Sequence, residues 1–130
     1  MDGLQPPFSE ALYAMKLETP SIKSCWSSEV QDLKKWQPED PEYVDLWFNV
    51  AIGMNGNEAA DDFQVHLVTE RQFSFVEDKK YLLVIPFYES WEQVLVLLKK
   101  EVEACAGINW IGMSALLEKK YLWEYHNYKS

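Results

Sequence analysis

The clearest pattern along the chain is an alternation of apolar and polar residues over Tyr43–Met54. A repeat of two residues is typical of a strand with one buried face. A second alternating run, Asp62–Thr69, follows a Gly-Met-Asn-Gly-Asn segment at 53–57, where Asn-Gly tolerates positive φ. The two runs therefore predict an antiparallel hairpin. The residues expected on its buried face are Leu46, Phe48, Val50, Ile52, Phe63, Val65 and Leu67.

Three further segments extend the predicted sheet. Ala11–Glu18 alternates and is expected to form a first strand, which ends at the Thr-Pro-Ser segment 19–21. Tyr81–Tyr88 is mostly apolar, which is typical of a strand near the sheet centre. Pro86 places the end of that strand at an edge or bulge, because proline cannot donate a ladder hydrogen bond. Leu122–Tyr128 alternates again and predicts a final strand.

Two helices are predicted in the C-terminal half. Ser90 and Gln93 match a capping box, and apolar residues recur at helical spacing from Trp91 to Cys105. Gly107 is expected to end this helix in the left-handed conformation. Asn109 suits the N-cap of a second helix. The apolar face of that helix is expected to comprise Trp110, Met113, Leu116 and Leu117. One or two helical turns are also expected within Ser27–Lys35.

The predicted order of elements is β-β-β-β-α-α-β, which indicates an α+β fold. The expected architecture is a mainly antiparallel sheet of about five strands with the two helices packed on one face. The 130 residues, 48% of them hydrophobic, are enough for one core without disulfides. We therefore expect residues 1–130 to form a single domain, in which residues 1–10 are a loose lead-in around Pro6 and Pro7.

The chain is acidic, with 21 Asp and Glu against 12 Lys and Arg and a formal net charge of −9. Arg71 is the sole arginine, and arginine is the side chain best suited to phosphate forks and base edges. Binding to nucleic acid or to an anionic membrane surface is therefore disfavoured. An acidic field speeds the encounter with a basic protein. The simpler interpretation of the charge is that it keeps a cytosolic protein in solution.

The sequence favours a cytoplasmic location. The N-terminal region has no basic segment followed by an apolar run, and no apolar stretch approaches the roughly 18 residues of a membrane span. Cys25 and Cys105 lack metal-ligand spacing. Cys105 lies on an apolar helical stripe, which indicates a buried thiol in a reducing compartment. A disulfide between the two cysteines is the alternative.

Sequence motifs for catalysis are missing. There is no Gly-x-Ser-x-Gly elbow, no glycine-rich phosphate loop and no His-Glu-x-x-His. We therefore predict no catalytic residue, no cofactor and no metal. His66 and His126 are the natural candidates for acid–base work. His66 falls on the polar side of its strand, and its simpler interpretation is an exposed strand histidine. A small enzyme that uses either histidine with a nearby carboxylate is kept as an alternative.

Two acidic clusters are the candidate binding residues. The first surrounds an elbow at residues 36–43, Trp-Gln-Pro-Glu-Asp-Pro-Glu-Tyr, and comprises Glu39, Asp40, Glu42 and Asp45. The second comprises Glu58, Asp61 and Asp62. The predicted hairpin places the clusters at its opposite ends. Trp47 is the candidate aromatic anchor of the interface centre, since aromatic residues are enriched there. The simpler interpretation of both clusters is solvated loops.

Three motifs in this order resemble the bacterial family called immunity protein 8, from polymorphic-toxin and contact-dependent inhibition systems. The elbow at 36–42 resembles that family's Pro-Glu-Asp-Pro elbow, which is followed by a strand like that through Phe48 and the Ile-Gly pair 52–53. Residues 102–107, with Trp110 shortly after, resemble its helix end. Residues 122–128, Leu-Trp-Glu-Tyr-His-Asn-Tyr, resemble its closing run. The chain departs from the family in two places: its hairpin turn is shorter, and segment 111–113 is apolar where the family has more acidic residues. These differences concern the identity of the partner more than membership of the family.

The resemblance implies a stoichiometric inhibitor, not an enzyme, that binds the C-terminal domain of a cognate toxin in the cytoplasm. Such toxins are commonly nucleases, which are basic because they bind phosphate. The expected toxin-binding residues are Glu39, Asp40, Glu42, Asp45, Trp47, Glu58, Asp61 and Asp62. A monomer or a weak homodimer paired through edge strands is expected. An acidic interaction or nucleic-acid-mimic module outside toxin systems is the alternative. The sequence leaves open the identity of the toxin and whether its active site is occluded.

Overall fold

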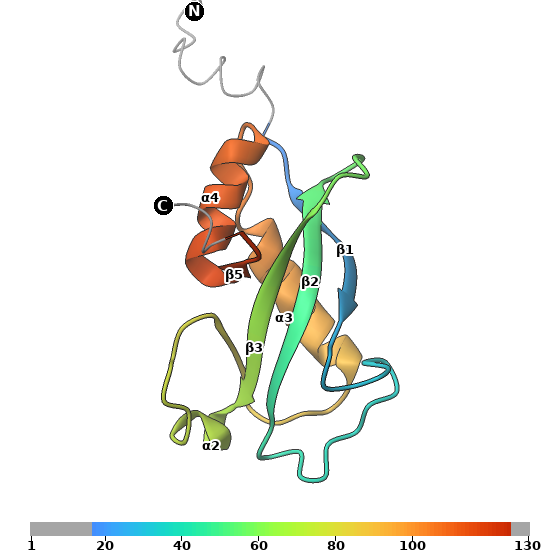
Figure 1. Ribbon diagram of the computed structural model, residues 1–130, viewed down its shortest axis with the longest axis vertical. Helices are drawn as coiled ribbons and strands as arrows, with labels where there is room; N and C mark the ends of the chain where they lie inside the picture. Colours follow the sequence, from blue (N-terminus) through green and yellow to red (C-terminus); the bar gives the residue numbers. More distant parts are fainter. Residues whose placement is uncertain (1–16, 126–130) are drawn as a thin grey trace, which may run out of the picture.

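The hairpin predicted from the two alternating runs forms the middle of a five-stranded sheet (Figure 1). The structure is a computed structural model that describes residues 17–125. Strands β2 (Asp45–Met54) and β3 (Asp61–Thr69) pair antiparallel, with Phe48 opposite Val65. All seven residues expected on the buried face of the hairpin are buried.

The sheet order is β1-β2-β3-β4, with β5 also paired to β3. Strand β1 (Pro20–Trp26) is antiparallel to β2, and β5 (Leu122–Trp123) is antiparallel to β3. Strand β4 (Leu82–Ile85) runs parallel to β3, because the chain first crosses through the short helix α2 (Glu70–Phe73) and a loop. The predicted α+β class and mostly antiparallel sheet are confirmed.

Helix α3 (Trp91–Glu103) lies across one face of the sheet (Figure 1). Its start is fixed by the predicted cap, because the Gln93 backbone N–H donates to Ser90 Oγ at 3.2 Å. The ring of Trp91 meets Phe48 of β2 edge to face, with centroids 5.1 Å apart. The buried residues of the helix are Trp91, Val94, Leu98 and Val102, which follow the predicted stripe.

Helix α4 (Trp110–Lys120) also begins where the sequence predicts. Asn109 Oδ1 accepts the backbone N–H of Gly112 at 2.9 Å. Met113 and Leu117 are buried, whereas Leu116, expected on the same face, is exposed.

The N-terminal part of the described chain differs from the prediction. The strand on this side is Pro20–Trp26, so Pro20 begins a strand rather than ending one, as proline can at the first residue of an edge strand. Of the strand expected at Ala11–Glu18, only Leu17 and Glu18 lie within the described residues, and Glu18 forms an isolated bridge with Gly107.

No helix forms within Ser27–Lys35; the segment contains one hydrogen-bonded turn, in which the Lys35 N–H donates to the Asp32 carbonyl at 3.1 Å. Ser27 Oγ donates to the Trp47 carbonyl at 2.8 Å, and Glu29 Oε2 accepts the Trp47 backbone N–H at 3.3 Å. These side chains continue the pairing of β2 beyond the end of β1. The first residues of the segment stay beside the sheet because their polar groups bind β2.

Three smaller expectations were wrong or fall outside the described residues. Strand β4 lies at the edge of the sheet rather than near its centre. Gly107 has no positive φ; it bridges Glu18, and an added Cβ would lie 3.2 Å from Met113 Cγ, so close approach explains the glycine. The final strand covers Leu122–Trp123, and residues 126–128 of the predicted strand lie outside the described part of the chain.

Candidate partner-binding surface

The elbow at residues 36–43 is fastened to the core at both ends. Trp36 packs edge to face against the buried Tyr88, with ring centroids 5.0 Å apart. The Tyr88 backbone N–H donates to the Pro41 carbonyl at 2.8 Å. The buried Thr69 hydroxyl donates to the Glu42 carbonyl at 2.7 Å and accepts the Val44 N–H at 3.0 Å. Two buried residues, Thr69 and Tyr88, therefore hold the elbow backbone in one conformation.

The four acidic residues of the first cluster, Glu39, Asp40, Glu42 and Asp45, are all exposed. Asp40 Oδ1 accepts the Glu42 backbone N–H at 3.0 Å, which tightens the turn. Glu42 also pairs with Arg71 at 2.9 Å, but both side chains are more than half exposed, so the pair contributes little stability.

Two aromatic rings lie beside these carboxylates. Tyr43, the last elbow residue, is 45% exposed, and Phe75, from the loop after α2, is 69% exposed. Their centroids are 6.4 Å apart. We call the six residues of this end the elbow surface: Glu39, Asp40, Glu42, Tyr43, Asp45 and Phe75. Sequence reasoning missed Phe75, although a phenylalanine in the polar stretch 70–80 was the available signal.

The second acidic cluster lies at the other end of the hairpin, as predicted, because Asp45 pairs with Val68 and Asp61 pairs with Ile52. Its two aspartates, Asp61 and Asp62, are half-buried and form hydrogen bonds within the fold. Asp61 Oδ2 accepts the Trp110 indole N–H at 3.2 Å. The Asp62 backbone exchanges hydrogen bonds with Glu124, at 2.9 and 3.2 Å.

Burial, together with the negative charges of Glu124 and Asp61, raises the pKa of Asp62. The carboxylates of Asp61, Asp62 and Glu124 therefore repel one another. Glu58 is exposed in the hairpin loop.

Trp47 and His66 lie opposite each other on the sheet face that points away from α3. Their rings stack at 4.5 Å with an interplanar angle of 14°. His66 Nε2 lies 2.6 Å from Asp45 Oδ1. His66 is only 6% exposed, so the expectation of an exposed histidine was wrong. The Trp47 indole covers it and is itself only half-buried.

The histidine–carboxylate pair does not have the setting of a catalytic site. An acid–base histidine needs a concave space in which a substrate approaches its ring. His66 has a carboxylate partner, but its ring is covered by Trp47, and His66 lines none of the pockets described below. His126 lies outside the described residues.

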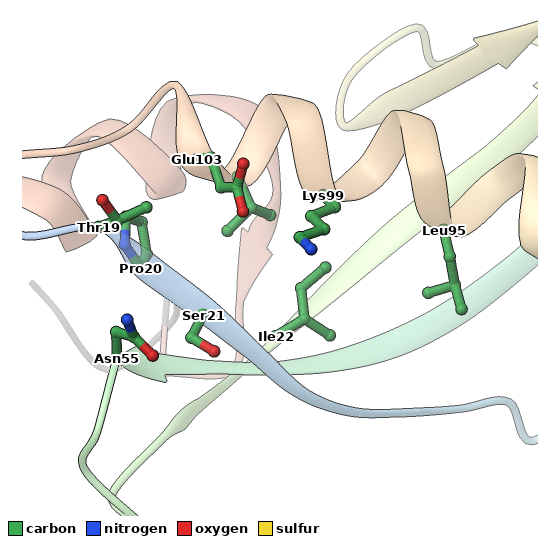
Figure 2. A pocket seen from close by; sticks show the side chains of 9 residues that line it. Thr19, Pro20, Ser21, Ile22, Asn55, Leu95, Lys99 and Glu103 are labelled. Atoms are coloured by element: carbon green, nitrogen blue, oxygen red, sulfur yellow. The ribbon is translucent and has the colours of Figure 1, made fainter.

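The pocket in Figure 2 lies between β1 and α3 and has a volume of about 440 Å³. Its lining residues are Thr19, Pro20, Ser21, Ile22, Asn55, Leu95, Lys99, Val102 and Glu103. The Lys99 side chain extends from α3 toward β1 (Figure 2). This lining contains no histidine or cysteine, and its single lysine and single glutamate give it no charge preference. A second pocket of about 560 Å³ lies beside Cys25 and Leu33.

Both cysteines are free thiols. Burial raises the pKa of Cys25 to about 11, and burial is also the main cause of a raised pKa at Cys105. Neither is a nucleophile near neutral pH. Within residues 17–125, no group of three or more His, Cys, Asp or Glu side chains is placed to hold a metal ion. No helix in that range is long and apolar enough to cross a bilayer.

Fold and surface together define an acidic α+β protein that presents carboxylates and an exposed tyrosine on a fastened elbow, with the exposed Phe75 close to that tyrosine. The chain belongs to the immunity protein 8 family, whose sequence profile matches residues 20–128. This match confirms the resemblance carried by the elbow, the helix end and the closing aromatic run. No curated protein and no solved structure matches the chain. Membership indicates an immunity protein of a toxin system, a class that binds a cognate toxin and is generally not enzymatic.

Proposed function

We propose that this protein binds the toxic C-terminal domain of its cognate toxin in the cytoplasm and neutralises it through the elbow surface. The observation that carries the proposal is the contrast between the two acidic clusters. The carboxylates of the elbow are exposed at the same end as exposed rings, whereas Asp61 and Asp62 are half-buried, and the Asp61 carboxylate accepts the Trp110 indole N–H.

The elbow surface combines the two residue types that typical interfaces use, aromatic residues at the centre and charged residues at the rim. Aromatic residues carry most binding energy at the centre of interfaces, and charged residues at the rim set the association rate. Tyr43 and Phe75 supply the rings, and the four exposed acids lie within six residues of Tyr43 along the chain. Because the elbow backbone is fastened through Thr69 and Tyr88, little conformational entropy is lost on binding.

The partner we propose is a basic nuclease domain. A nuclease carries positive charge where it binds phosphate, and a set of carboxylates on a rigid turn complements that charge. The net charge of −9 adds long-range attraction, which raises the association rate at low salt. A one-to-one complex that weakens as salt is added is the expected form.

The test is co-expression with the toxic domain encoded next to this protein, followed by purification of the complex. We expect rescue of growth, co-purification and a salt-sensitive association rate. Rescue without a complex would contradict direct inhibition. If the neighbouring domain is toxic alone and is not rescued, the two are not a pair.

The interface is tested with Glu39→Gln/Glu42→Gln, compared with Glu77→Gln/Glu103→Gln, which removes the same charge at two other exposed sites. We expect the elbow variant to slow association about tenfold at low salt, and the control to change it by less than about threefold. Equal effects of the two variants would show that net charge, not the elbow, attracts the toxin. The family assignment does not depend on that outcome.

A further inference from the structure

A basic basin lies between α3, the end of α4 and the segment before β4, and has a volume of about 610 Å³. Its lining residues are Lys79, Tyr81, Leu82, Leu97, Lys100, Glu101, Ala104, Lys119 and Lys120. Four lysines therefore meet in one hollow of a chain that has only 12 basic residues and a net charge of −9. We call this hollow the lysine basin.

Three separate segments bring the lysines together. Lys100 lies on the side of α3 that also presents Leu97 and Glu101, at helical spacing. Lys119 and Lys120 form the end of α4. Lys79 lies in the loop that leads to β4. The like charges in this hollow repel one another, and a bound anion would relieve that repulsion.

Two of the four ammonium groups are held in place by the backbone. Lys79 Nζ donates to the Phe73 carbonyl at 3.1 Å and lies 4.7 Å from the centre of the Phe73 ring. Lys120 Nζ donates to the Glu101 carbonyl at 3.0 Å. Lys100 and Lys119 are exposed. The basin thus contains two ammonium groups fixed by backbone carbonyls, those of Lys79 and Lys120. The exposed side chains of Lys100 and Lys119 can move toward a ligand.

The single carboxylate in the lining is already engaged. Glu101 Oε1 accepts the hydroxyl of Tyr121 at 2.7 Å, and Tyr121 is fully buried. Glu101 therefore faces a core tyrosine as well as the basin. The lining keeps three more positive than negative charges.

Tyr81 adds an independent sign of a binding site. Its φ is 63°, which makes it the one described non-glycine residue in the left-handed region. The backbone is held there by the His66 N–H, which donates to the Tyr81 carbonyl at 2.9 Å. Left-handed tyrosines are strained, and such strain concentrates at ligand sites.

We propose that the lysine basin binds a small anion with two or more phosphate groups, of the nucleotide class. Ammonium groups form strong charge-assisted bonds to phosphate oxygens. The volume lies within the range of roughly 300–1,000 Å³ of small-molecule sites. Leu82, Leu97 and the half-buried Tyr81 supply apolar surface for the rest of the ligand.

The charge of the whole chain restricts the ligand to a small one. The field of exposed charges is screened over about 8 Å at physiological ionic strength, so the lysines act only within the basin. A long nucleic acid would extend beyond the basin over a chain whose net charge is −9 and be repelled. A nucleotide fits inside the positive region.

The test uses the purified full chain without toxin, so its outcome is independent of the proposed inhibitory function. Pyrophosphate, ATP, adenosine and a short single-stranded RNA are titrated, and amide shifts in the nuclear magnetic resonance spectrum are followed. We expect pyrophosphate and ATP to shift the amides of Tyr81, Lys100 and Lys119, and adenosine alone to leave them unchanged.

The matched variants are Lys100→Gln/Lys119→Gln in the basin and Lys34→Gln/Lys35→Gln at an exposed pair elsewhere. The basin variant is expected to weaken ATP binding about tenfold, and the control less than about twofold. Unchanged spectra with millimolar pyrophosphate and ATP, or equal losses in both variants, overturn the proposal. Tighter binding of the RNA than of ATP also overturns it.

Discussion

The imidazole of His66 lies parallel to the indole of Trp47, with ring centroids 4.5 Å apart, on adjacent strands of the sheet. The stack shields the short contact between His66 Nε2 and Asp45. The Trp47–His66 pair thus connects the sheet, through His66, to Asp45 of the first acidic cluster. Loss of the indole uncovers the histidine and removes packing on the sheet face that points away from α3.

We expect Trp47→Ala to lower the free energy of unfolding by about 2–3 kcal/mol, below the range for a fully buried tryptophan because Trp47 is half-buried. Urea unfolding measures the change. Trp47→Phe keeps a ring over His66 and should lose less than half as much. Equal losses in the two variants would show that the stack itself adds nothing.

The raised pKa of Asp62 makes a prediction about pH. The native carboxyl group holds its proton more tightly than the unfolded one, so ionised Asp62 destabilises the fold at neutral pH. As pH falls through the raised pKa toward the ordinary value of 3.8, this penalty disappears and stability from this group rises. Asp62→Asn should therefore stabilise the protein by a few tenths of a kcal/mol at pH 7 and by nothing at low pH.

Unfolding of Asp62→Asn and the wild type at pH 7 and near the ordinary aspartate pKa of about 4 provides the measurement. The neighbouring change Asp61→Ala serves as a contrast, since it removes the acceptor of the Trp110 indole and should destabilise by about 1 kcal/mol. A gain in Asp62→Asn that is the same at both pH values would mean that charge is not its source.

Gly53 and Gly112 are expected to respond to alanine in opposite directions. A Cβ at Gly53 would lie 2.0 Å from the Ala59 carbonyl oxygen, so the hairpin loop must move. A Cβ at Gly112 meets Asn109 Oδ1 at an ordinary 3.6 Å, inside α4. Thermal unfolding should show Gly53→Ala destabilised by about 2 kcal/mol or more, and Gly112→Ala stabilised by about 0.5–1 kcal/mol. A Gly53→Ala variant as stable as wild type would contradict the close approach.

The raised pKa of Cys25 predicts its reactivity. Burial keeps the thiol protonated up to about pH 11, so alkylation in the native state should be much slower than in urea. The native thiol binds its proton more tightly than the unfolded one, whose ordinary pKa is 9.0, so stability falls as pH rises from 9 to 11. Cys25→Ser should flatten this decline. Rapid native-state labelling of Cys25 at pH 8 would refute the account.

The sequence predicted those elements whose signal is local. Period-two runs and an Asn-Gly turn located β2 and β3, and the side-chain caps of Ser90 and Asn109 located α3 and α4. Strand β1 was missed because a bulge between Ile22 and Ser24 breaks its alternation. The four residues of β4 carry too little pattern to distinguish an edge from a centre.

In the candidate site, too, the sequence predicted only the features that depend on local signals. Periodicity placed the two acidic clusters at opposite ends of the hairpin, which the strand register confirms. It did not separate the exposed elbow carboxylates from Asp61, whose carboxylate accepts from Trp110, or from Asp62, whose backbone bonds Glu124, because these partners lie about 50 to 60 residues away along the chain. The burial of His66 was missed for the same reason, since it depends on the indole of the neighbouring strand.

The pairing of β5 with β3 has a consequence for biosynthesis. The outer edge of β3 accepts Leu122–Trp123, almost at the end of the described chain, and Glu18 pairs with Gly107. A ribosome that adds about 5–20 residues per second exposes β3 for several seconds before its last neighbour emerges. The sheet is therefore completed only after residue 123 has been synthesised, and a chain truncated before residue 122 would leave part of the β3 edge unpaired and prone to aggregation.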